Sequence, residues 1–405
     1  NAVVVGNANL TDVLLGTGGT GPTREQVIDW ARGVDIQDLD ADGNVTEAAR
    51  SMGDPLHARP ALVSFGGALD TPDPRDVVVL VPTNDGVLHA IDARTGVELW
   101  SFVPPELLGR LRQLVENRPQ NPRSYGLDGD VRVLKFDRNQ NGVVEPGDGD
   151  RVWAYFGMRR GGRNYYALDI TDRARPQLLW ILGPNNLSDV GESWSTPAIA
   201  RVRVAGAAQN GEKLVLIFGG GYDGGQENYS YRTDTMGNGI YMVDAASGAL
   251  LWYAGGPGGT GAADLDLPNM THSIPSRIVT LDNDGDGFAD RLYAADLGGR
   301  VWRFDIFNGQ GRGSLVTGGV FASLGGAVNP SPASTRRFYY APDVALIQRR
   351  GAEPYYNLAI GSGYRGHPLD ASAQDRFYSL RDKNPFGKLS QSQYDSATPL
   401  GEGNL

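Results

Sequence analysis

The stretch Ile240-Tyr-Met-Val-Asp244, followed by Ser247-Gly248 and Leu251-Trp252, contains the pattern that determines the fold. A short apolar strand ends in an aspartate, a small turn follows, and a Leu-Trp pair begins the next strand. An aspartate at this place can fix a tight turn by accepting backbone amide hydrogens, and a tryptophan can pack between neighbouring sheets. We therefore interpret the pattern as a structural repeat and not as a catalytic motif.

The pattern recurs along the chain at Leu88–Asp92 with Leu99-Trp100, Tyr165–Asp169 with Leu179-Trp180, Val301–Asp305 and, more weakly, Phe377–Asp382. An apolar strand ending near a glycine precedes each copy, and four of the five copies have a further strand beside a proline upstream. About four strands per repeat are typical of a β-propeller. We expect an all-β, modified β-propeller of four-stranded blades with five clear repeats. Residues 110–150 and the C-terminus leave room for irregular blades.

Only two stretches predict helices. Thr23 and Gln26 have capping-box spacing ahead of an apolar turn, and Gly33 can end that helix. Pro104 and Pro105 precede an apolar stripe with helical spacing. We expect one propeller domain over residues 1–405, in which residues 1–50 supply a helix and an Asp-rich loop that lead into the first blade.

Composition excludes several classes of function. The chain has 405 residues, 37 Lys and Arg against 47 Asp and Glu, and a formal net charge of −10, so we expect neither nucleic-acid binding nor adhesion to an anionic membrane. It has no Cys, which excludes disulfides, thiol catalysis and thiolate metal sites. No apolar run approaches the roughly 20 residues of a membrane-spanning helix. Because the sequence begins with Asn1 and shows no signal peptide, we interpret it as a fragment of a longer exported protein.

The strongest chemical signal is a loop with four acidic residues within nine positions. Asp282, Asp284, Asp286 and Asp290 stand at positions 1, 3, 5 and 9, a glycine stands at position 6, and Phe288 offers a backbone carbonyl at position 7. This all-oxygen set is the one that Ca²⁺ prefers. Position 12 lacks the EF-hand glutamate, so we expect a calcium loop between two strands. An Asp/Gly-rich turn without an ion is the alternative.

Two further loops repeat part of this spacing, and we treat both as candidate calcium sites against unmetallated Asx turns. The second candidate has a lower charge and comprises Asp137, Asn139, Asn141, Val143 (through its carbonyl), Glu145 and Asp148. The third candidate is degenerate in its second half and comprises Asp38, Asp40, Asp42, Asn44 and Glu47.

Other chemistry has little support in the sequence. The four His residues have no paired metal-binding spacing, and no nucleophile elbow is present. Because the chain has many acidic residues, the sequence leaves open the alternative that two of its carboxylates catalyse glycoside hydrolysis. The loop Tyr222–Gly239, with Tyr229, Tyr231 and Arg232, is either a contact surface or a solvated insertion.

The chain resembles the C-terminal domain of the PilY1 family of type IV pilus biogenesis and tip-adhesin proteins. The resemblance rests on Gly53–Pro60, Thr83–Ala90, Tyr166–Thr171 and the loop Asp282–Asp290 continuing through Tyr293–Asp305. It is collinear from about Ile28 to Arg381. It implies a seven-bladed modified propeller that is exported to the cell surface and associated with the pilus, and roles in pilus extension, twitching motility and surface adhesion.

The resemblance also implies that calcium at the loop Asp282–Asp290 controls pilus retraction. The partners it implies are pilus components such as minor pilins, and a host or abiotic surface. The chain lacks the large N-terminal region of such proteins and has no Arg-Gly-Asp tripeptide. We therefore expect a non-enzymatic calcium-binding propeller. The alternatives are a quinoprotein dehydrogenase that uses PQQ, which the absence of Cys disfavours, and a carbohydrate-binding propeller without a pilus role.

Overall fold

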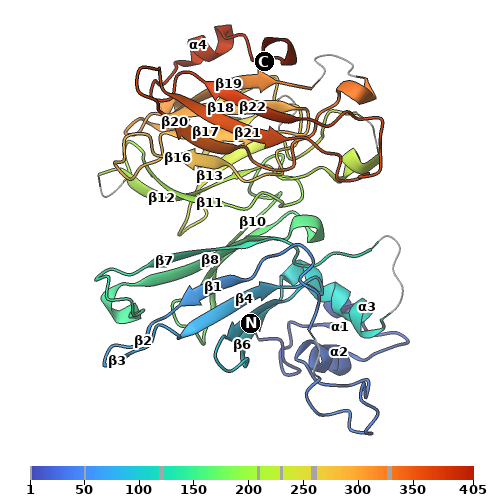
Figure 1. The fold of residues 1–405 in the computed structure, drawn as a ribbon. Helices are drawn as coiled ribbons and strands as arrows, with labels where there is room; N and C mark the ends of the chain where they lie inside the picture. The colour runs from blue at the N-terminus through green and yellow to red at the C-terminus, as the bar shows by residue number, and fades with distance from the viewer. Residues whose placement is uncertain are drawn as a thin grey trace. The chain divides into compact units, whose positions relative to one another are not determined.

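The computed structural model describes residues 2–49, 52–117, 123–207, 210–228, 231–256, 262–325 and 331–405 (Figure 1). The chain divides into two compact units. Unit 1 comprises Asn1–Val131, Asp137–Asp150 and Thr171–Pro176, and unit 2 comprises Arg132–Phe136, Arg151–Ile170 and Gln177–Leu405. The prediction of a single domain over the whole chain stays a prediction.

Five sheets carry the five repeats, and we number them as blades in chain order. Blade 1 is β1 (Ala61–Ser64), β4 (Val77–Pro82), β5 (Leu88–Asp92) and β6 (Glu98–Phe102). Blade 2 is β7 (Val131–Phe136), β8 (Arg151–Gly157), β9 (Tyr165–Asp169) and β10 (Gln177–Leu182). Blade 3 is β11 (Ala198–Arg203), β12 (Glu212–Gly219), β13 (Gly239–Asp244) and β14 (Leu250–Gly255), extended by the parallel strand β15 (Leu265–Asp266).

Blade 4 is β16 (Val279–Leu281), β17 (Arg291–Ala295), β18 (Arg300–Ile306) and β19 (Val316–Ser323). Blade 5 has three strands, β20 (Asp343–Ile347), β21 (Tyr355–Gly361) and β22 (Phe377–Asp382). A separate hairpin pairs β2 (Gly67–Ala68) with β3 (Thr71–Pro72). In each blade the strands follow one another in chain order, as four-stranded propeller blades require, and the expected all-β propeller architecture is confirmed.

The helices are short. They are α1 (Asp12–Leu15), α2 (Arg24–Ala31), α3 (Leu111–Val115) and α4 (Gln391–Ser396), with 3₁₀ turns η1 (Pro105–Arg110), η2 (Pro146–Asp148), η3 (Arg159–Gly161), η4 (Gly224–Asn228), η5 (Arg312–Ser314), η6 (Pro332–Ser334) and η7 (Glu402–Asn404). The predicted helix after Pro104 is therefore a 3₁₀ turn followed by one α-helical turn. The described part of residues 110–150 contributes α3 and the first strand of blade 2, and not a separate blade.

The repeat residues have the structural roles that the sequence predicts. Asp244 Oδ1 accepts the amides of Ala246 at 3.2 Å and Ser247 at 3.0 Å, which closes the turn after β13. The Trp180 indole of blade 2 donates to the Ala245 carbonyl of blade 3 at 3.1 Å. The aspartate therefore fixes the turn within a blade, while the tryptophan connects that blade to the next.

The core of unit 2 lies between successive blades. Tyr165 of blade 2 packs against Phe218 of blade 3 with ring centroids 4.4 Å apart. Trp252 of blade 3 meets Phe304 of blade 4 edge-on at 6.1 Å. Buried apolar side chains of blades 4 and 5 form a further cluster that includes Tyr293. Apolar burial between adjacent sheets therefore stabilises the unit.

Helix α2 begins at the predicted capping box. The Thr23 hydroxyl accepts the Gln26 amide at 3.3 Å, and the Gln26 side chain accepts the Thr23 amide at 2.9 Å. We expect Thr23→Ala to lower the free energy of unfolding by about 1 kcal/mol, because the amide loses its acceptor. Urea denaturation measures the change. Thr23→Ser keeps the hydroxyl and should retain the stability; equal losses in both variants would contradict the capping role.

Candidate metal centre

The loop between β16 and β17 brings together three of its four predicted carboxylates. Asp282, Asp284 and Asp290 each offer one oxygen, and the three oxygens lie within 4.8 Å of one another. Asp282 and Asp284 are exposed, whereas Asp290 is buried. Three convergent acidic oxygens of this kind fit a hard divalent cation such as Ca²⁺.

Backbone amides hold Asp282 in place. Its two carboxylate oxygens accept the amides of Gly285 at 2.7 Å and Gly287 at 2.8 Å. Both glycines have left-handed φ angles, +79° and +86°, which only glycine adopts readily. Burial alone would raise the pKa of Asp282, but the loop amides outweigh it and bring the pKa below its usual value. The carboxylate is therefore ionised and oriented before any ion arrives.

Asp286 does not join this group in the described structure. Its Oδ2 lies 3.2 Å from Arg203 Nη1 of β11, and its Oδ1 accepts the Phe288 amide at 2.9 Å. The Phe288 ring is buried beneath the Arg203 guanidinium, 3.7 Å from the ring centroid. A protein cation therefore neutralises the carboxylate at position 5, which stays a predicted ligand.

Asp290 connects the loop to distant parts of unit 2. Its Oδ2 accepts the Asn283 amide at 2.9 Å, and its Oδ1 accepts the Lys388 ammonium at 2.8 Å. Lys388 also donates to the Ile306 carbonyl at 2.8 Å. The Tyr356 hydroxyl of β21 donates to the Asn283 side chain at 2.8 Å. The loop thus contacts both blade 5 and the C-terminal segment.

The second candidate loop joins β7 to β8 and has the same backbone turn. Asp137 Oδ2 accepts the Gly142 amide at 2.8 Å, as Asp282 accepts Gly287, and Asn141 Oδ1 accepts the Val143 amide at 2.8 Å. Gly142 and Gln140 have φ angles of +87° and +58°, at the loop positions that Gly287 and Gly285 occupy in the first loop. The spacing therefore predicts the turn correctly.

Several acceptors of this second loop are satisfied within it, whereas the buried Asp137 Oδ1 has no hydrogen-bond partner among the described residues. Glu145 Oε2 accepts the side-chain amides of Asn139 at 3.3 Å and Asn141 at 2.8 Å. The Asp148 carbonyl accepts an Arg138 guanidinium hydrogen at 3.4 Å. Among the residues that the structure describes, this loop forms no group of three convergent acids. Its role as a calcium site stays a prediction.

The third candidate loop also has this turn, although its sequence is degenerate. Asp38 Oδ1 accepts the Gly43 amide at 3.0 Å, and Gly43 has a φ of +85°. Asp42 Oδ1 accepts the Asn44 amide at 2.7 Å, and Asn44 lies 3.5 Å from Glu47 Oε2. Acidic oxygens converge here in two overlapping groups, namely Asp38, Asp40 and Asp42, and Asp35, Asp40 and Glu47.

Sequence spacing missed a buried aspartate in each of the second and third loops. In the first loop Asp290 accepts the amide of the second loop residue. Asp150 does the same in the second loop, accepting the Arg138 amide at 2.8 Å, and Asp35 does so in the third, accepting the Leu39 amide at 2.9 Å. Asp150 and Asp35 are both buried. The three loops therefore share one hydrogen-bonding scheme that the spacing alone describes only in part.

One signal could have identified Asp150. It stands immediately before Arg151, the first residue of β8, just as Asp290 stands immediately before Arg291, the first residue of β17. Aligning the loops on the strand that follows them, instead of on their first aspartate, makes Asp150 the counterpart of Asp290. Asp35 precedes its loop, so no such alignment reaches it.

The predicted contact loop Tyr222–Gly239 contains η4. Arg232 pairs with Asp223 at 2.7 Å, and the Tyr231 ring lies 5.6 Å from the His272 ring. Tyr229 lies outside the described residues. The first contact lies within the loop and the second joins the loop to His272, and the interpretation as a contact surface stays a prediction. No helix in the described ranges has the length and apolar character that a bilayer crossing needs.

Known proteins share both the sequence pattern and the fold. The family described as the PilY1 beta-propeller domain matches residues 46–321. The type IV pilus biogenesis factor PilY1 of Pseudomonas aeruginosa is 28% identical over 364 residues, which cover 84% of this chain and 27% of that protein. The dehydrogenase subunit of a quinone alcohol dehydrogenase from Gluconacetobacter polyoxogenes is 25% identical over 318 residues, 72% of this chain and 37% of that protein.

The crystal structure of the Pseudomonas aeruginosa PilY1 C-terminal domain has the same fold. It superposes with a TM-score of 0.56 at 24% identity, covering 85% of this chain and 68% of that one. This chain spans about a quarter of the full length of the pilus biogenesis factor. Since the family match extends over more than half of the sequence, this chain belongs to the family of PilY1 β-propeller domains.

Proposed function

We propose that this chain is the calcium-binding propeller of a type IV pilus biogenesis and adhesion protein. In this role it regulates pilus extension and retraction, twitching motility and surface attachment, and it turns over no substrate. It acts at the cell surface, on the pilus, with minor pilins and a host or abiotic surface as its partners.

Family membership supports the role in pilus biogenesis. The relative from Pseudomonas aeruginosa is named a type IV pilus biogenesis factor, and its similarity to this chain extends over 84% of the residues. A role in pilus biogenesis places the protein in the cell envelope and favours a non-enzymatic function.

The convergence of Asp282, Asp284 and Asp290 supports the binding of calcium. Three carboxylates this close repel one another unless a cation lies among them. Asp286 and the Phe288 carbonyl would complete the shell of oxygen ligands. When bound, the ion supplies two positive charges and crosslinks the two ends of the loop. The loops at Asp137–Asp148 and Asp38–Glu47 are proposed as further calcium sites.

The contacts of Asp290 and Asn283 provide a route from the ion to the rest of unit 2. Asp290 holds Lys388 of the C-terminal segment, and Asn283 holds Tyr356 of blade 5. An ion that draws Asp290 inward changes both contacts. Calcium would therefore shift the populations of the C-terminal segment and of the contact with β21, and through them the affinity for a pilus partner.

Calcium titration of the whole chain by isothermal titration calorimetry tests the proposal. We expect binding with a dissociation constant of about 10⁻⁴ to 10⁻³ M, the range of extracellular modules. Saturation at about 100 times that constant should stabilise the fold by about 2.7 kcal/mol. Asp284→Ala should remove one equivalent of bound calcium, because the loop loses a ligand. The variant should still fold, because this carboxylate is exposed and accepts the Asp286 amide within the loop.

Asp343→Ala, at an exposed position on β20, is the matched control and should titrate like the wild type. A stoichiometry above one in the wild type would support the second and third loops. If the wild type binds no calcium at 10 mM, or if Asp284→Ala keeps every equivalent, the loop is not a calcium site.

A quinoprotein dehydrogenase is the alternative, which the 25% identity to the quinone alcohol dehydrogenase subunit favours. The chain has no Cys, whereas a pair of neighbouring cysteines over the cofactor would support this reading. Incubation with PQQ and calcium followed by gel filtration distinguishes the two functions. Stoichiometric retention of the chromophore would overturn the non-enzymatic proposal.

A further inference from the structure

Blade 5 has one strand fewer than the other blades. In blades 1 to 4 the third strand pairs with a fourth: β5 with β6, β9 with β10, β13 with β14 and β18 with β19. In blade 5 the third strand, β22, pairs with β21 and is the last strand of its sheet. Among the described residues, the outer side of β22 (Phe377–Asp382) therefore has no neighbouring strand, and we call this side the open edge.

The register of β22 identifies the backbone groups at the open edge. The Ser362 amide donates to the Arg376 carbonyl at 2.9 Å, so these two residues form a hydrogen-bonded pair. Such pairs alternate with non-bonded pairs along an antiparallel ladder, which directs the amides and carbonyls of Phe377, Ser379 and Arg381 away from β21. All three residues are exposed, and no described group bonds to these outward amides and carbonyls.

The segment that follows β22 covers the outer edge of blade 4 instead. The Gln391 side chain accepts the Gly318 amide of β19 at 3.0 Å and donates to the Gly318 carbonyl at 3.0 Å. The Leu400 amide donates to the Phe321 carbonyl at 3.0 Å, and its carbonyl accepts the Ser323 amide at 2.8 Å. The part of the chain that forms the fourth strand in other blades is therefore bound to β19.

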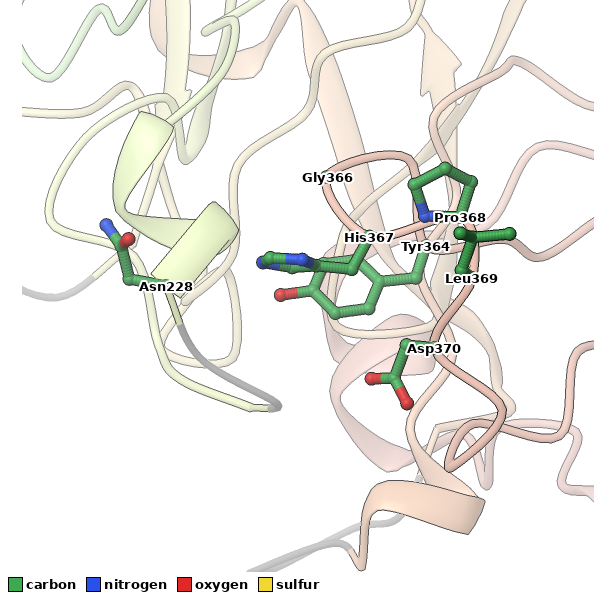
Figure 2. A pocket seen from close by; sticks show the side chains of 7 residues that line it. All are labelled: Asn228, Tyr364, Gly366, His367, Pro368, Leu369 and Asp370. Atoms are coloured by element: carbon green, nitrogen blue, oxygen red, sulfur yellow. The ribbon is translucent and has the colours of Figure 1, made fainter. Parts of the chain in front are cut away.

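The connection that precedes β22 contacts η4. The Tyr364 hydroxyl donates to the Gln226 carbonyl at 3.0 Å, and His367 Nε2 contacts the Glu227 carbonyl. Figure 2 shows both side chains directed toward the turn that carries Asn228, at a pocket of about 570 Å³. Both segments that flank β22 therefore bond elsewhere in unit 2, and neither provides the missing strand.

The exposed side chains of β22 are aromatic at one end and basic at the other. Phe377 is 74% exposed. Arg381 lies four residues later on the same face of the strand, where its Cζ atom is 5.1 Å from the Tyr355 ring centroid of β21. An unpaired edge with a large exposed apolar side chain is a template for pairing with another strand.

We propose that the open edge pairs with the open edge of a second copy of this chain, as two antiparallel strands related by a two-fold axis at Ser379. The axis brings the outward backbone groups of the two strands opposite each other. Phe377, Ser379 and Arg381 of each copy then exchange about six backbone hydrogen bonds with the other copy. Each blade 5 thereby gains the fourth strand that the other blades have.

The side chains of β22 are complementary to themselves in this register. Phe377 lies opposite the partner's Arg381, and a guanidinium is attracted to the face of an aromatic ring. One pair further out, the exposed Asp375 lies opposite the partner's Lys383, so that opposite charges meet. The two-fold axis repeats both pairs, which makes the contact isologous and closed. This self-complementarity favours a second copy over an unrelated strand.

Sedimentation equilibrium of the whole chain tests the proposal. The protein is studied in calcium-free buffer from about 1 µM to about 1 mM, the range of weak complexes. We expect the weight-average mass to rise with concentration from that of one chain toward that of two. It should not rise further, because each copy has one open edge and the pair uses both.

Two substitutions of Phe377 test the register. Phe377→Lys places a positive charge opposite the partner's Arg381, whereas Phe377→Glu places a negative charge there and is the matched control. Both remove the aromatic ring at the same exposed position. We expect Phe377→Lys to dimerise at least about tenfold more weakly than Phe377→Glu, because the axis makes each substitution act twice.

Two substitutions of Ser379 test the backbone pairing. Ser379→Pro removes an outward amide at the axis, and proline is tolerated on an edge strand where the amide has no partner. Ser379→Ala is the control, because it loses only the hydroxyl that donates to Asn357 Oδ1 at 2.8 Å. Ser379→Pro should dimerise at least about tenfold more weakly than Ser379→Ala. Circular dichroism verifies that each variant folds.

Three outcomes would overturn the proposal. A wild-type chain that stays monomeric at 1 mM would leave the open edge to an unrelated strand or to solvent. Equal dimerisation of Phe377→Lys and Phe377→Glu would place the contact elsewhere on the surface. A mass that grows beyond two chains would exclude an isologous pair. Since no calcium is present, these outcomes are independent of the calcium proposal.

Discussion

Asp305→Ala is expected to lower the free energy of unfolding by about 3–5 kcal/mol, the largest effect that we anticipate for a single substitution in this chain. Asp305 is completely buried. It accepts hydrogen bonds from Arg291 Nε at 2.8 Å, Arg303 Nη2 at 3.1 Å, the Tyr394 hydroxyl at 2.7 Å and the Leu389 amide at 2.9 Å. Among the described residues, alanine would leave the buried guanidiniums of Arg291 and Arg303 to share the carboxylate of Asp382, 3.6 Å and 2.9 Å away, and one positive charge would be uncompensated.

Urea denaturation of the wild type and the variant measures the loss. Glu212→Gln is the matched control, because it removes one partner of the exposed Arg201–Glu212 pair, whose atoms are 2.7 Å apart. An exposed pair contributes about 0–1 kcal/mol. The loss of unfolding free energy in Asp305→Ala could instead stay within about 1 kcal/mol of the loss in the control. Water or rearranged side chains would then provide the hydrogen-bond acceptors for the arginines, and the network would not stabilise the fold.

The network around Asp305 also fixes the C-terminal segment. Arg291 donates to the carbonyls of Asn384 at 2.9 Å, Pro385 at 2.7 Å and Gly387 at 2.6 Å. A guanidinium that is fully buried and donates to three carbonyls needs a fixed counter-charge, which Asp305 provides at its Nε. The aspartate of the fourth repeat shares this network with the aspartate of the fifth repeat, Asp382, which pairs with Arg303 at 2.9 Å and accepts the Asn384 amide at 3.0 Å.

The sequence predicted those parts of the molecule that depend on local pattern. The repeat of strand, aspartate, turn and tryptophan identified all five blades, because each blade is built from neighbouring segments. It missed β7 as the first strand of blade 2, because Val131–Phe136 has no proline marker upstream. The glycines that the loop spacing places at position 6, namely Gly43, Gly142 and Gly287, all have left-handed φ angles in the structure.

The parts that the sequence did not predict depend on contacts between distant residues. Arg203 reaches Asp286 from 83 positions away, and Lys388 reaches Asp290 from 98 positions away. The spacing of residues within a nine-residue loop carries no information about either cation, because both come from distant parts of the chain. The arginines around Trp194 are a stronger case, since Arg159 and Arg160 follow β8 whereas Arg365 follows β21, and the three share no motif.

Lys388→Gln is expected to tighten calcium binding at the loop Asp282–Asp290 by about tenfold or more. The Lys388 ammonium lies 2.8 Å from Oδ1 of Asp290, a proposed ligand residue. Unit charges 4 Å apart interact by about 4 kcal/mol at an effective dielectric constant of 20. Lysine mobility and hydration reduce that value, and a remaining 1.4 kcal/mol corresponds to the tenfold change. Calorimetric titration with CaCl₂ measures it.

Lys383→Gln provides the matched control, because Lys383 is exposed on the same segment and its substitution should leave the calcium affinity unchanged.

The same titration tests whether calcium and the C-terminal segment are coupled. Since Lys388 competes with the ion for Asp290, calcium should make backbone amides near Leu389 exchange faster with deuterium in the wild type, and should have a smaller effect in Lys388→Gln. Unchanged affinity in Lys388→Gln would mean that Asp290 accommodates the ammonium and the ion together, and that the loop binds calcium without affecting the C-terminal segment.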